Sequence, residues 1–423
     1  MNSRSMFARS TFARIWPLTL TQACTALTDN MVRNAVIVLA LFRLGAGGTG
    51  LAALAGALLM APYIFLSATA GQIADRFAKP GLIRITKIAE LLVMLGTGAA
   101  FVTQSLPGLL AAIFCLGTQA AIFGPLKYGI LPELLAEDAL VSGNAIVEGT
   151  TFLAIVVGTI VGGALILAPH GTILVSAVGI VVALLGLYGA MRVPSLPAAA
   201  PTLHIGANFI AETWRTTRHA LAVRPIRRSI LGLSWFWTVG ATLLTELPVI
   251  TRDTLGAEGQ VLTLLLTVFA VGVGAGSFGC ARLLHGDVSA RHVPLAALGI
   301  TVFLVDFAYA CAGFPAGHLV TIWQILAAPA GWRVLADLFL MAASGGIFSV
   351  PLYAIMQHRS EAIHRARIIA AYPGLDETTL DLVVLYAEAN PVRGRPRRFA
   401  ALPEKAIVIA ERTVPRRRRA WNC

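Results

Sequence analysis

The sequence is dominated by apolar runs of about 20 residues, the length that a helix needs to cross the hydrocarbon of a bilayer. Hydrocarbon offers backbone N–H and C=O groups no partner, so such runs are stable there as α-helices. Only 13% of the 423 residues are charged, whereas soluble chains carry about 25%. We therefore predict an all-α polytopic membrane protein. About ten transmembrane helices are expected, near residues 15–40, 50–74, 82–103, 106–126, 140–168, 171–191, 229–251, 260–284, 294–315 and 332–356.

A polar, arginine-containing segment interrupts the apolar runs after the sixth of them. It divides the chain into a half with six predicted helices and a half with four. The predicted parts are an N-terminal tail (1–14), a six-helix half (15–191), a central linker (192–228), a four-helix half (229–371) and a basic tail (372–423).

Basic residues lie mainly on one side of the predicted membrane. Nineteen Lys and Arg residues of the connecting segments fall on the side of the N-terminus, and three fall on the other, Arg43, Arg252 and Arg333. Because Lys and Arg mark cytoplasmic segments, the N-terminus and the linker are expected in the cytoplasm. The same rule accounts for the net charge of +12, so no nucleic-acid partner is expected.

Two pairs of stretches repeat weakly between the halves. Residues 121–133 read AIFGPLKYGILPE and residues 346–358 read GIFSVPLYAIMQH, each at the end of the fourth apolar run of its half. Residues 71–79, GQIADRFAK, follow the second run, and residues 276–284, GSFGCARLL, follow its counterpart. Two related halves are typical of secondary transporters, which bind their substrate between the halves near the membrane midplane.

The stretch GQIADRFAK supplies a candidate gating motif, formed by Gly71, Asp75, Arg76 and Lys79. A glycine lets helices approach closely, and an acidic residue here can pair with a cation or stabilise the start of the next helix. A breakable ion pair at this place would hold one face of a carrier closed. The plain alternative is an ordinary basic loop. Cys280 replaces the acid in the second copy, so a full latch is expected only in the first half.

The Gly-x-x-x-Asp-Arg-x-x-Lys pattern of this stretch resembles the signature loop of the major facilitator superfamily. Longer stretches look like the lysophospholipid transporter family within that superfamily, and together the resemblance covers about residues 12–371. These stretches are LTDNMVRNAVIVLAL from residue 27, FGPLKYGILPELL from 123, SGNAIVEGTTFLAIVVGTIVGG from 142 and GGIFSVPLYAIMQHRSEAIHRARIIAA from 345.

The resemblance implies a two-half major-facilitator bundle with twelve helices. It also implies a carrier that moves lysophospholipids, chiefly lysophosphatidylethanolamine and lysophosphatidylglycerol, to the inner leaflet of the bacterial inner membrane by alternating access. In the family these lipids are then reacylated, in some relatives by an acyltransferase and an acyl-carrier-protein ligase fused to the transporter. The expected partners are therefore the lysophospholipid, the bilayer and a separate acyltransferase or ligase.

The first apolar run carries opposite charges, Asp29 and Arg33. At about 100° per residue, both belong to a polar stripe roughly 80° wide that normally faces a bundle interior or a wet cavity. We expect Asp29 to meet the ammonium and Arg33 the phosphate of a lipid head group. The plain alternative is a structural pair one turn apart. The stripe also holds Gln22 and Thr25, and Asn30 and Asn34 flank it.

Other helices supply further candidates for this cavity. Glu148 is a charge within the fifth apolar run, and Lys127 and Tyr128 close the fourth. Lys127 is expected either to bind phosphate or to reach the membrane surface along its aliphatic stem. Weaker candidates for the same cavity are Glu246, Asp306 and Asp337.

Catalytic, metal and cofactor motifs are missing from the sequence. The eight histidines are scattered, without a His-Glu-x-x-His pattern, and no phosphate-binding loop is present. The glycines of residues 274–279 match a dinucleotide-binding pattern but lie inside an apolar run, where they indicate close helix packing. We expect no metal, no cofactor and no enzymatic activity.

The apolar pattern ends after residue 371, and the remaining residues contain no run of about 20 apolar residues. We expect a disrupted reading frame near this point, with the last two of twelve helices missing and transport impaired. A basic tail attracted to anionic lipid is the other interpretation. Two further functions stay open: a proton-coupled exporter of drugs or small molecules with Asp29 or Glu148 as proton carrier, and a non-transporting membrane platform for an acyltransferase.

Overall fold

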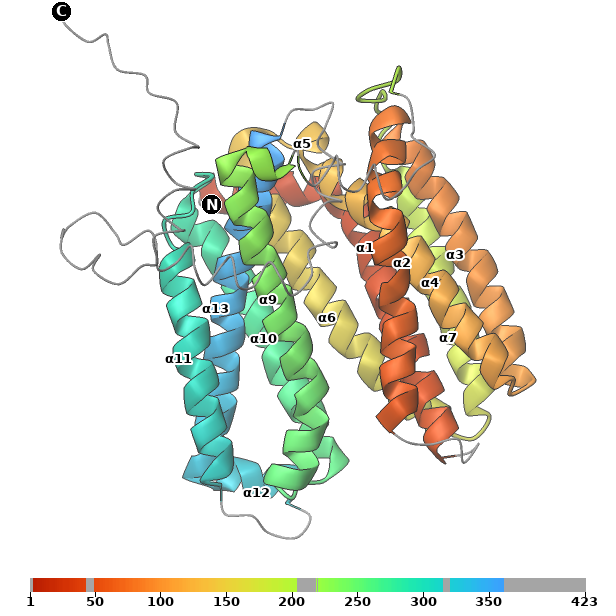
Figure 1. Cartoon of the computed structure of the whole chain (residues 1–423), viewed down its shortest axis with the longest axis vertical. Coiled ribbons are helices and arrows are strands. Elements are labelled where there is room, and N and C mark those ends of the chain that lie inside the picture. Colours follow the sequence, from red (N-terminus) through yellow and green to blue (C-terminus); the bar gives the residue numbers. More distant parts are fainter. Residues whose placement is uncertain (1–2, 43–48, 204–217, 219, 315–319, 361–423) are drawn as a thin grey trace, which may run out of the picture. The chain divides into compact units, whose positions relative to one another are not determined.

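The computed structural model describes residues 3–42, 49–203, 218, 220–314 and 320–360. In these residues the secondary structure consists of helices joined by loops (Figure 1), with an isolated bridge between Ala257 and Val320. The tail predicted for residues 372–423 lies outside the described residues. The helices are α1 (Ser3–Phe42), α2 (Thr49–Arg76), α3 (Lys79–Val102), α4 (Leu106–Gly129), α5 (Leu131–Leu134), η1 (Glu137–Ala139), α6 (Leu140–Leu167), α7 (Gly171–Arg192), α9 (Arg224–Val249), η2 (Ile250–Thr254), α10 (Gly259–Leu284), α11 (Val293–Ala312), α12 (Ile322–Ala327) and α13 (Pro329–Arg359).

Several of these helices can cross a membrane. In the described part of the chain, seven spans are long and apolar enough, or eight if the bent pair 54–67 and 69–76 within α2 is one span. The seven are α3, α4 with α5, η1 with α6, α7, α10, α11 and α13. The expected total of about ten, and the loss of the last two helices, remain predictions.

The two halves repeat one packing pattern. In the first half α2 and α3 both pack on α4, and in the second half α10 and α11 both pack on α13. Likewise α1 packs on α4 as α9 packs on α13. Helices α6 and α7 pack on α1, and α6 also contacts α10 and α13 of the second half. The repeat seen in the sequence is thus matched by equivalent helix contacts.

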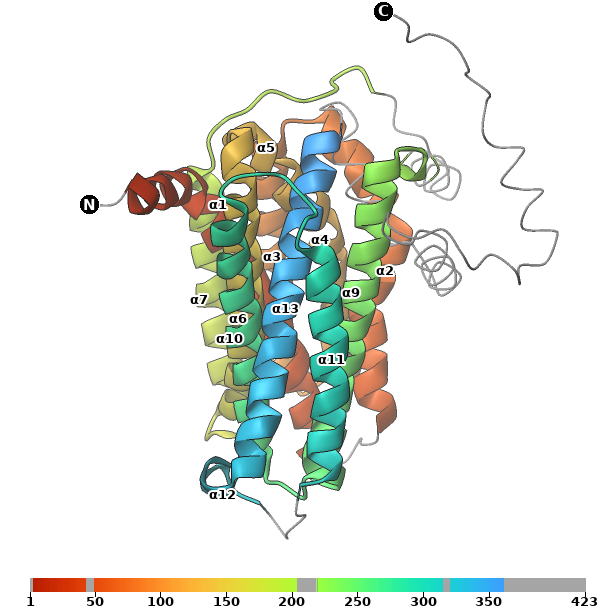
Figure 2. The ribbon, with the colours of Figure 1, turned by 90° about the vertical axis from the view of Figure 1, so that its left-hand side faces the viewer.

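Helix α1 begins at Ser3, so residues 3–14 of the expected N-terminal tail are helical. The start of α1 lies at a steep angle to the rest of the helix (Figure 2). Pro17 lies inside α1; proline lacks the N–H donor and crowds the preceding turn, so it bends helices.

Two glycines let α6 pack unusually close to α1. A Cβ atom at Gly158 would collide with the backbone carbonyl of Leu27, and one at Gly162 would collide with that of Met31. Both carbonyls belong to the α1 segment that contains Asp29. The close contact therefore fixes the position of the polar stripe of α1 against α6.

We predict that Gly158→Ala destabilises the protein by about 1–3 kcal/mol, because the added methyl group forces α1 and α6 apart. The measurement is thermal or denaturant unfolding of the purified protein in detergent. Gly124→Ala is the matched control, since a Cβ there meets no neighbouring heavy atom within 4 Å. Equal stability of the two variants would contradict the close packing.

Candidate functional site

Asp29 lies in the middle of α1 with only 8% of its surface exposed. Its Oδ1 atom is buried and has no hydrogen-bond partner in the described structure. Arg33 donates to Oδ1 of Asn30 at 2.9 Å rather than to Asp29. The charges acting on Asp29 come from three helices: Arg33 on α1, Lys87 and Glu90 on α3, and Lys127 on α4. Asp29 thus lies among several charges without being neutralised by a direct ion pair.

Two other residues predicted for the site connect α1 to α6. Gln22 donates to Oγ1 of Thr150 at 2.7 Å and accepts from Thr151 at 2.6 Å. Asn34 donates to the carbonyl of Thr159 at 2.7 Å. Their polar atoms are therefore used in contacts between α1 and α6. Arg33 and Asn30 are half-buried.

Lys127, Tyr128 and Glu148 come together where α4 meets α6. The Tyr128 hydroxyl donates to Oε1 of Glu148, and the Lys127 ammonium lies 4.8 Å from the centre of the Tyr128 ring. Glu148 is fully buried, and its Oε2 atom lacks a hydrogen-bond partner in the described structure. The charges acting on Lys127 include those of Glu148 and Asp29. The candidates from α1, α4 and α6 therefore form one group of interacting charges.

A further buried charged pair on α3 was missed by sequence reasoning. Lys87 is one of the nineteen basic residues that the charge pattern assigned to the side of the N-terminus. In the structure it is fully buried in the third turn of α3, and Glu90 is fully buried beside it. Their side chains form an ion pair at 2.5 Å. The spacing of opposite charges three residues apart inside the apolar run 82–103 was the available signal.

The two halves meet through aromatic side chains from the repeated stretches. Tyr128 and Tyr353 occupy equivalent positions in AIFGPLKY and GIFSVPLY, and their rings stack at 4.5 Å with an angle of 7°. The indole N–H of Trp237 donates to the Tyr353 hydroxyl at 2.9 Å. Phe152 of α6 stacks on Trp237 at 5.7 Å. The stack joins Glu148, through Tyr128, to the second half.

Polar contacts also join the halves, at the end of the bundle where α5, the start of α6 and the end of α13 lie (Figure 1). Asn144 donates to Gln357 at 2.7 Å, and Gln357 donates back to Asn144 at 3.0 Å. At the rim, Nε2 of His358 lies 3.2 Å from Oε1 of Glu137. We call this side the α5 end and the opposite side the α12 end.

The predicted gating motif lies at the α5 end. Gly71 and Asp75 are buried, and Arg76 is half-buried with its guanidinium over the Phe77 ring at 5.4 Å. Lys79 is fully buried and forms an ion pair with Glu133 of α5 at 2.5 Å. The motif therefore ties the start of α3 to the segment that joins α4 and α6.

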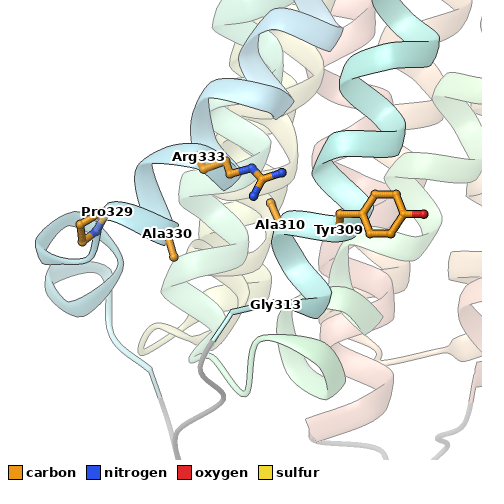
Figure 3. A pocket seen from close by; sticks show the side chains of 6 residues that line it. All are labelled: Tyr309, Ala310, Gly313, Pro329, Ala330 and Arg333. Carbon is orange, nitrogen blue, oxygen red and sulfur yellow. The ribbon is translucent and has the colours of Figure 1, made fainter.

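The three weaker candidates lie apart from this group. Glu246 is exposed near the end of α9. Asp306 of α11 forms an exposed ion pair with Arg333 of α13, and the charges of both act on Asp337. Arg333 also lines a cavity of about 300 Å³ at the α12 end (Figure 3). The remaining residues that line this cavity are Tyr309, Ala310, Gly313, Pro329 and Ala330.

The described residues contain no group of three or more His, Cys, Asp or Glu side chains able to hold a metal ion. The candidate groups are side-chain charges and hydrogen-bonding groups. They can recognise a charged or zwitterionic molecule.

Known proteins match the chain over most of its length. The family model of the Major Facilitator Superfamily matches residues 18–373. The lysophospholipid transporter LplT of Serratia proteamaculans (strain 568) is 30% identical over 331 residues, which are 77% of this chain and 76% of that protein. The protein of the same name from Pectobacterium carotovorum subsp. carotovorum (strain PC1) is 31% identical over 77% of this chain and 74% of its own length.

Solved structures with a similar fold are themselves transporters. A bacterial homologue of the iron transporter ferroportin, crystallised in an outward-facing state, matches with a TM-score of 0.61 and 16% identity over 89% of this chain and 91% of that one. The major facilitator transporter FucP in its outward conformation matches with a TM-score of 0.62 and 14% identity over 89% and 93% of the two chains. At these identities the likeness concerns the fold.

We predict that the double variant Asn144→Ala with Gln357→Ala loses less stability than the sum of the losses of the two single variants. Either single change leaves a buried amide without its partner, which costs about 1–3 kcal/mol, whereas the double variant removes both amides. A double-mutant cycle of unfolding free energies in detergent measures the difference. Gln260→Ala, an exposed position, is the control. Additive effects of the two single changes would show that the halves do not depend on this contact.

Proposed function

Because the chain belongs to the major facilitator superfamily and, within it, to the lysophospholipid transporter family, we propose that it carries lysophospholipids to the inner leaflet of the bacterial inner membrane by alternating access. Family membership makes the chain a multi-pass membrane transporter rather than an enzyme. The lipid class is proposed from the names of the relatives. The single observation that carries the proposal is the set of buried charges around Asp29 of α1. Asp29 belongs to the stretch LTDNMVRNAVIVLAL, which resembles the family.

Charge complementarity supports a phospholipid head group as the ligand. Arg33 and Lys127 are half-buried cations, and a guanidinium and an ammonium both bind phosphate well. Asp29 supplies a carboxylate with an unpaired oxygen for the ammonium of an ethanolamine head group. A lone charge in hydrocarbon costs about 3 kcal/mol on insertion scales, so a ligand that complements both signs would offset part of that cost. Asn30 and Glu148 lie within the same network in this proposal.

The orientation follows from the basic residues. The α5 end holds Arg76, Lys79 and Arg84, and we assign it to the cytoplasm by the positive-inside rule. The α5 end is also where the Asn144–Gln357 and Tyr128–Tyr353 contacts join the halves. In this proposal the carrier is closed toward the cytoplasm and receives lipid from the outer leaflet.

Inward release requires these contacts to break. The Tyr128–Tyr353 stack and the Asn144–Gln357 pair would separate as the halves rock about the central site. The buried Lys79–Glu133 pair lies within the first half and would travel with it. Delivered lysophospholipid would then meet a separate acyltransferase or acyl-carrier-protein ligase, the partner that acylation of such a product requires.

We predict that Asp29→Asn and Arg33→Ala each slow lysophospholipid movement about tenfold, the effect of losing one charge-assisted hydrogen bond. The assay follows labelled lysophosphatidylethanolamine across proteoliposomes that contain the full-length protein, with and without a proton gradient. Asp253→Asn, which changes an exposed carboxylate outside the candidate spans, should leave the rate unchanged.

Insertion and folding of each variant are checked by size-exclusion chromatography. Normal transport rates in both variants would show that Asp29 and Arg33 have a purely structural role. No movement by the unaltered protein would refute the proposed function.

A further inference from the structure

The cavity at the α12 end lies between the end of α11 and the start of α13 and has a volume of about 300 Å³. Small walls come from Ala310 and Gly313 of α11 and from Pro329 and Ala330 of α13. The charged residue of the lining is Arg333, whose side chain extends from α13 toward α11 (Figure 3). Pockets for small molecules have volumes of about 300–1,000 Å³, so a lipid head group fits here.

Negative charge is in excess beside this cavity. Arg333 pairs with Asp306 of α11, and the charges of both act on Asp337, one turn further along α13. Only 6% of the surface of Asp337 is exposed, and its Oδ2 atom has no hydrogen-bond partner in the described structure. Buried acceptors are nearly always paired. Two carboxylates, one guanidinium and an unpaired buried oxygen therefore point to a cationic ligand that donates hydrogen bonds.

Helix α12 fixes the wall of the cavity that α13 supplies. A capping box at Thr321 stabilises the start of α12. The indole N–H of Trp332 donates to the carbonyl of Leu326 at 2.8 Å. A Cβ atom at Gly331 would collide with the carbonyl of Ile325, so the start of α13 packs closely on α12. The cavity is therefore preformed, as sites for small molecules usually are.

Exposed aromatic side chains lie at the same end of the bundle. Tyr309 of α11, Trp323 of α12 and Trp332 of α13 are between 58% and 80% exposed. Trp and Tyr gather where a membrane meets water, and α11 and α13 are both candidate spans. In the orientation proposed above, the α12 end faces away from the cytoplasm. The cavity then lies at the level of the head groups of the outer leaflet.

Resting on the proposed function, we propose that this cavity is a second lipid site, which captures the head group of an ethanolamine lysophospholipid before the lipid reaches the central site. Arg333 binds the phosphate, since a guanidinium matches two phosphate oxygens. The ammonium donates its N–H groups to Asp306 and Asp337. The ligand thus replaces both members of the Arg333–Asp306 pair. Exposed ion pairs contribute little stability, so this exchange is easy.

The excess of carboxylates predicts which head group the cavity prefers. A glycerol head group offers a phosphate to Arg333 but has no cation for the two carboxylates. A choline head group carries a cation, but its quaternary nitrogen has no N–H to donate to Oδ2 of Asp337. An ethanolamine head group supplies the phosphate, the positive charge and the donors together. None of these side chains belongs to the contacts proposed above for the central site.

The first test counts the lysophosphatidylethanolamine molecules that the full-length protein retains in native mass spectra. We expect two per chain. Asp337→Asn should weaken one of them about tenfold, the effect of losing one charge-assisted hydrogen bond, and Asp29→Asn should weaken the other. Ala330→Phe, which fills the cavity without changing its charge, should remove the same lipid as Asp337→Asn. Lysophosphatidylglycerol should be retained only at the site that depends on Asp29.

The matched control is Asp253→Asn, since Asp253 is also an exposed carboxylate paired with an arginine. This variant should retain both lipids. Soluble glycerophosphoethanolamine should compete weakly, because it lacks the acyl chain. Unchanged retention in both Asp337→Asn and Ala330→Phe, equal retention of lysophosphatidylglycerol at the cavity, or competition by the soluble compound as strong as by the lipid would overturn the proposal.

The second test uses the proteoliposome assay. Capture precedes movement, so Asp337→Asn should raise the concentration of lysophosphatidylethanolamine that gives half the maximal rate about tenfold and leave the maximal rate unchanged. A lower maximal rate at an unchanged half-saturating concentration would contradict a capture site. If the unaltered protein moves no lysophospholipid, the proposed function fails, while the lipid count still decides whether the cavity binds the head group.

Discussion

The cost of burying charge among membrane helices governs the first half of this protein. A lone charge in hydrocarbon costs about 3 kcal/mol on insertion scales, and the half contains Asp29, Lys87 and Glu90 well inside its helices. Each charge must therefore face another polar group, and this requirement decides which side of α1, α3 and α4 points inward. The lipid-facing sides are left to apolar residues such as Ile85, Leu92 and Leu95, which are exposed in the structure.

Much of this arrangement was predictable, because helix periodicity and charge rules are local. The apolar runs predicted the all-α class, and the charge at Asp29 and Arg33 predicted that α1 has an inward polar face. Side-chain partners were not predictable in the same way. Gln22 belongs to the same stripe as Asp29, yet its amide is used by Thr150 and Thr151 of α6, a choice that depends on how two distant helices pack.

Lys87 shows where the charge rule misleads. A lysine near the end of an apolar run is normally assigned to the membrane surface, and here it points inward because Glu90 and Thr25 offer it partners. A pairing of this kind appears only when α1 and α3 are brought together. The contact between the repeated tyrosines could not be predicted from the alignment of two short stretches either. The local sequence does not indicate that Tyr128 and Tyr353 stack on each other.

The Tyr128–Tyr353 stack has an evolutionary consequence. Two residues at the same position of a repeat can touch face to face only if they lie next to the axis that relates the repeats. In a symmetric dimer, a residue on the two-fold axis meets its own copy. The stack is therefore the contact that two identical half-length chains would have made before duplication and fusion joined them. The two equivalent tyrosines now have different partners, since Tyr128 donates to the Glu148 carboxylate and Tyr353 accepts from the Trp237 indole.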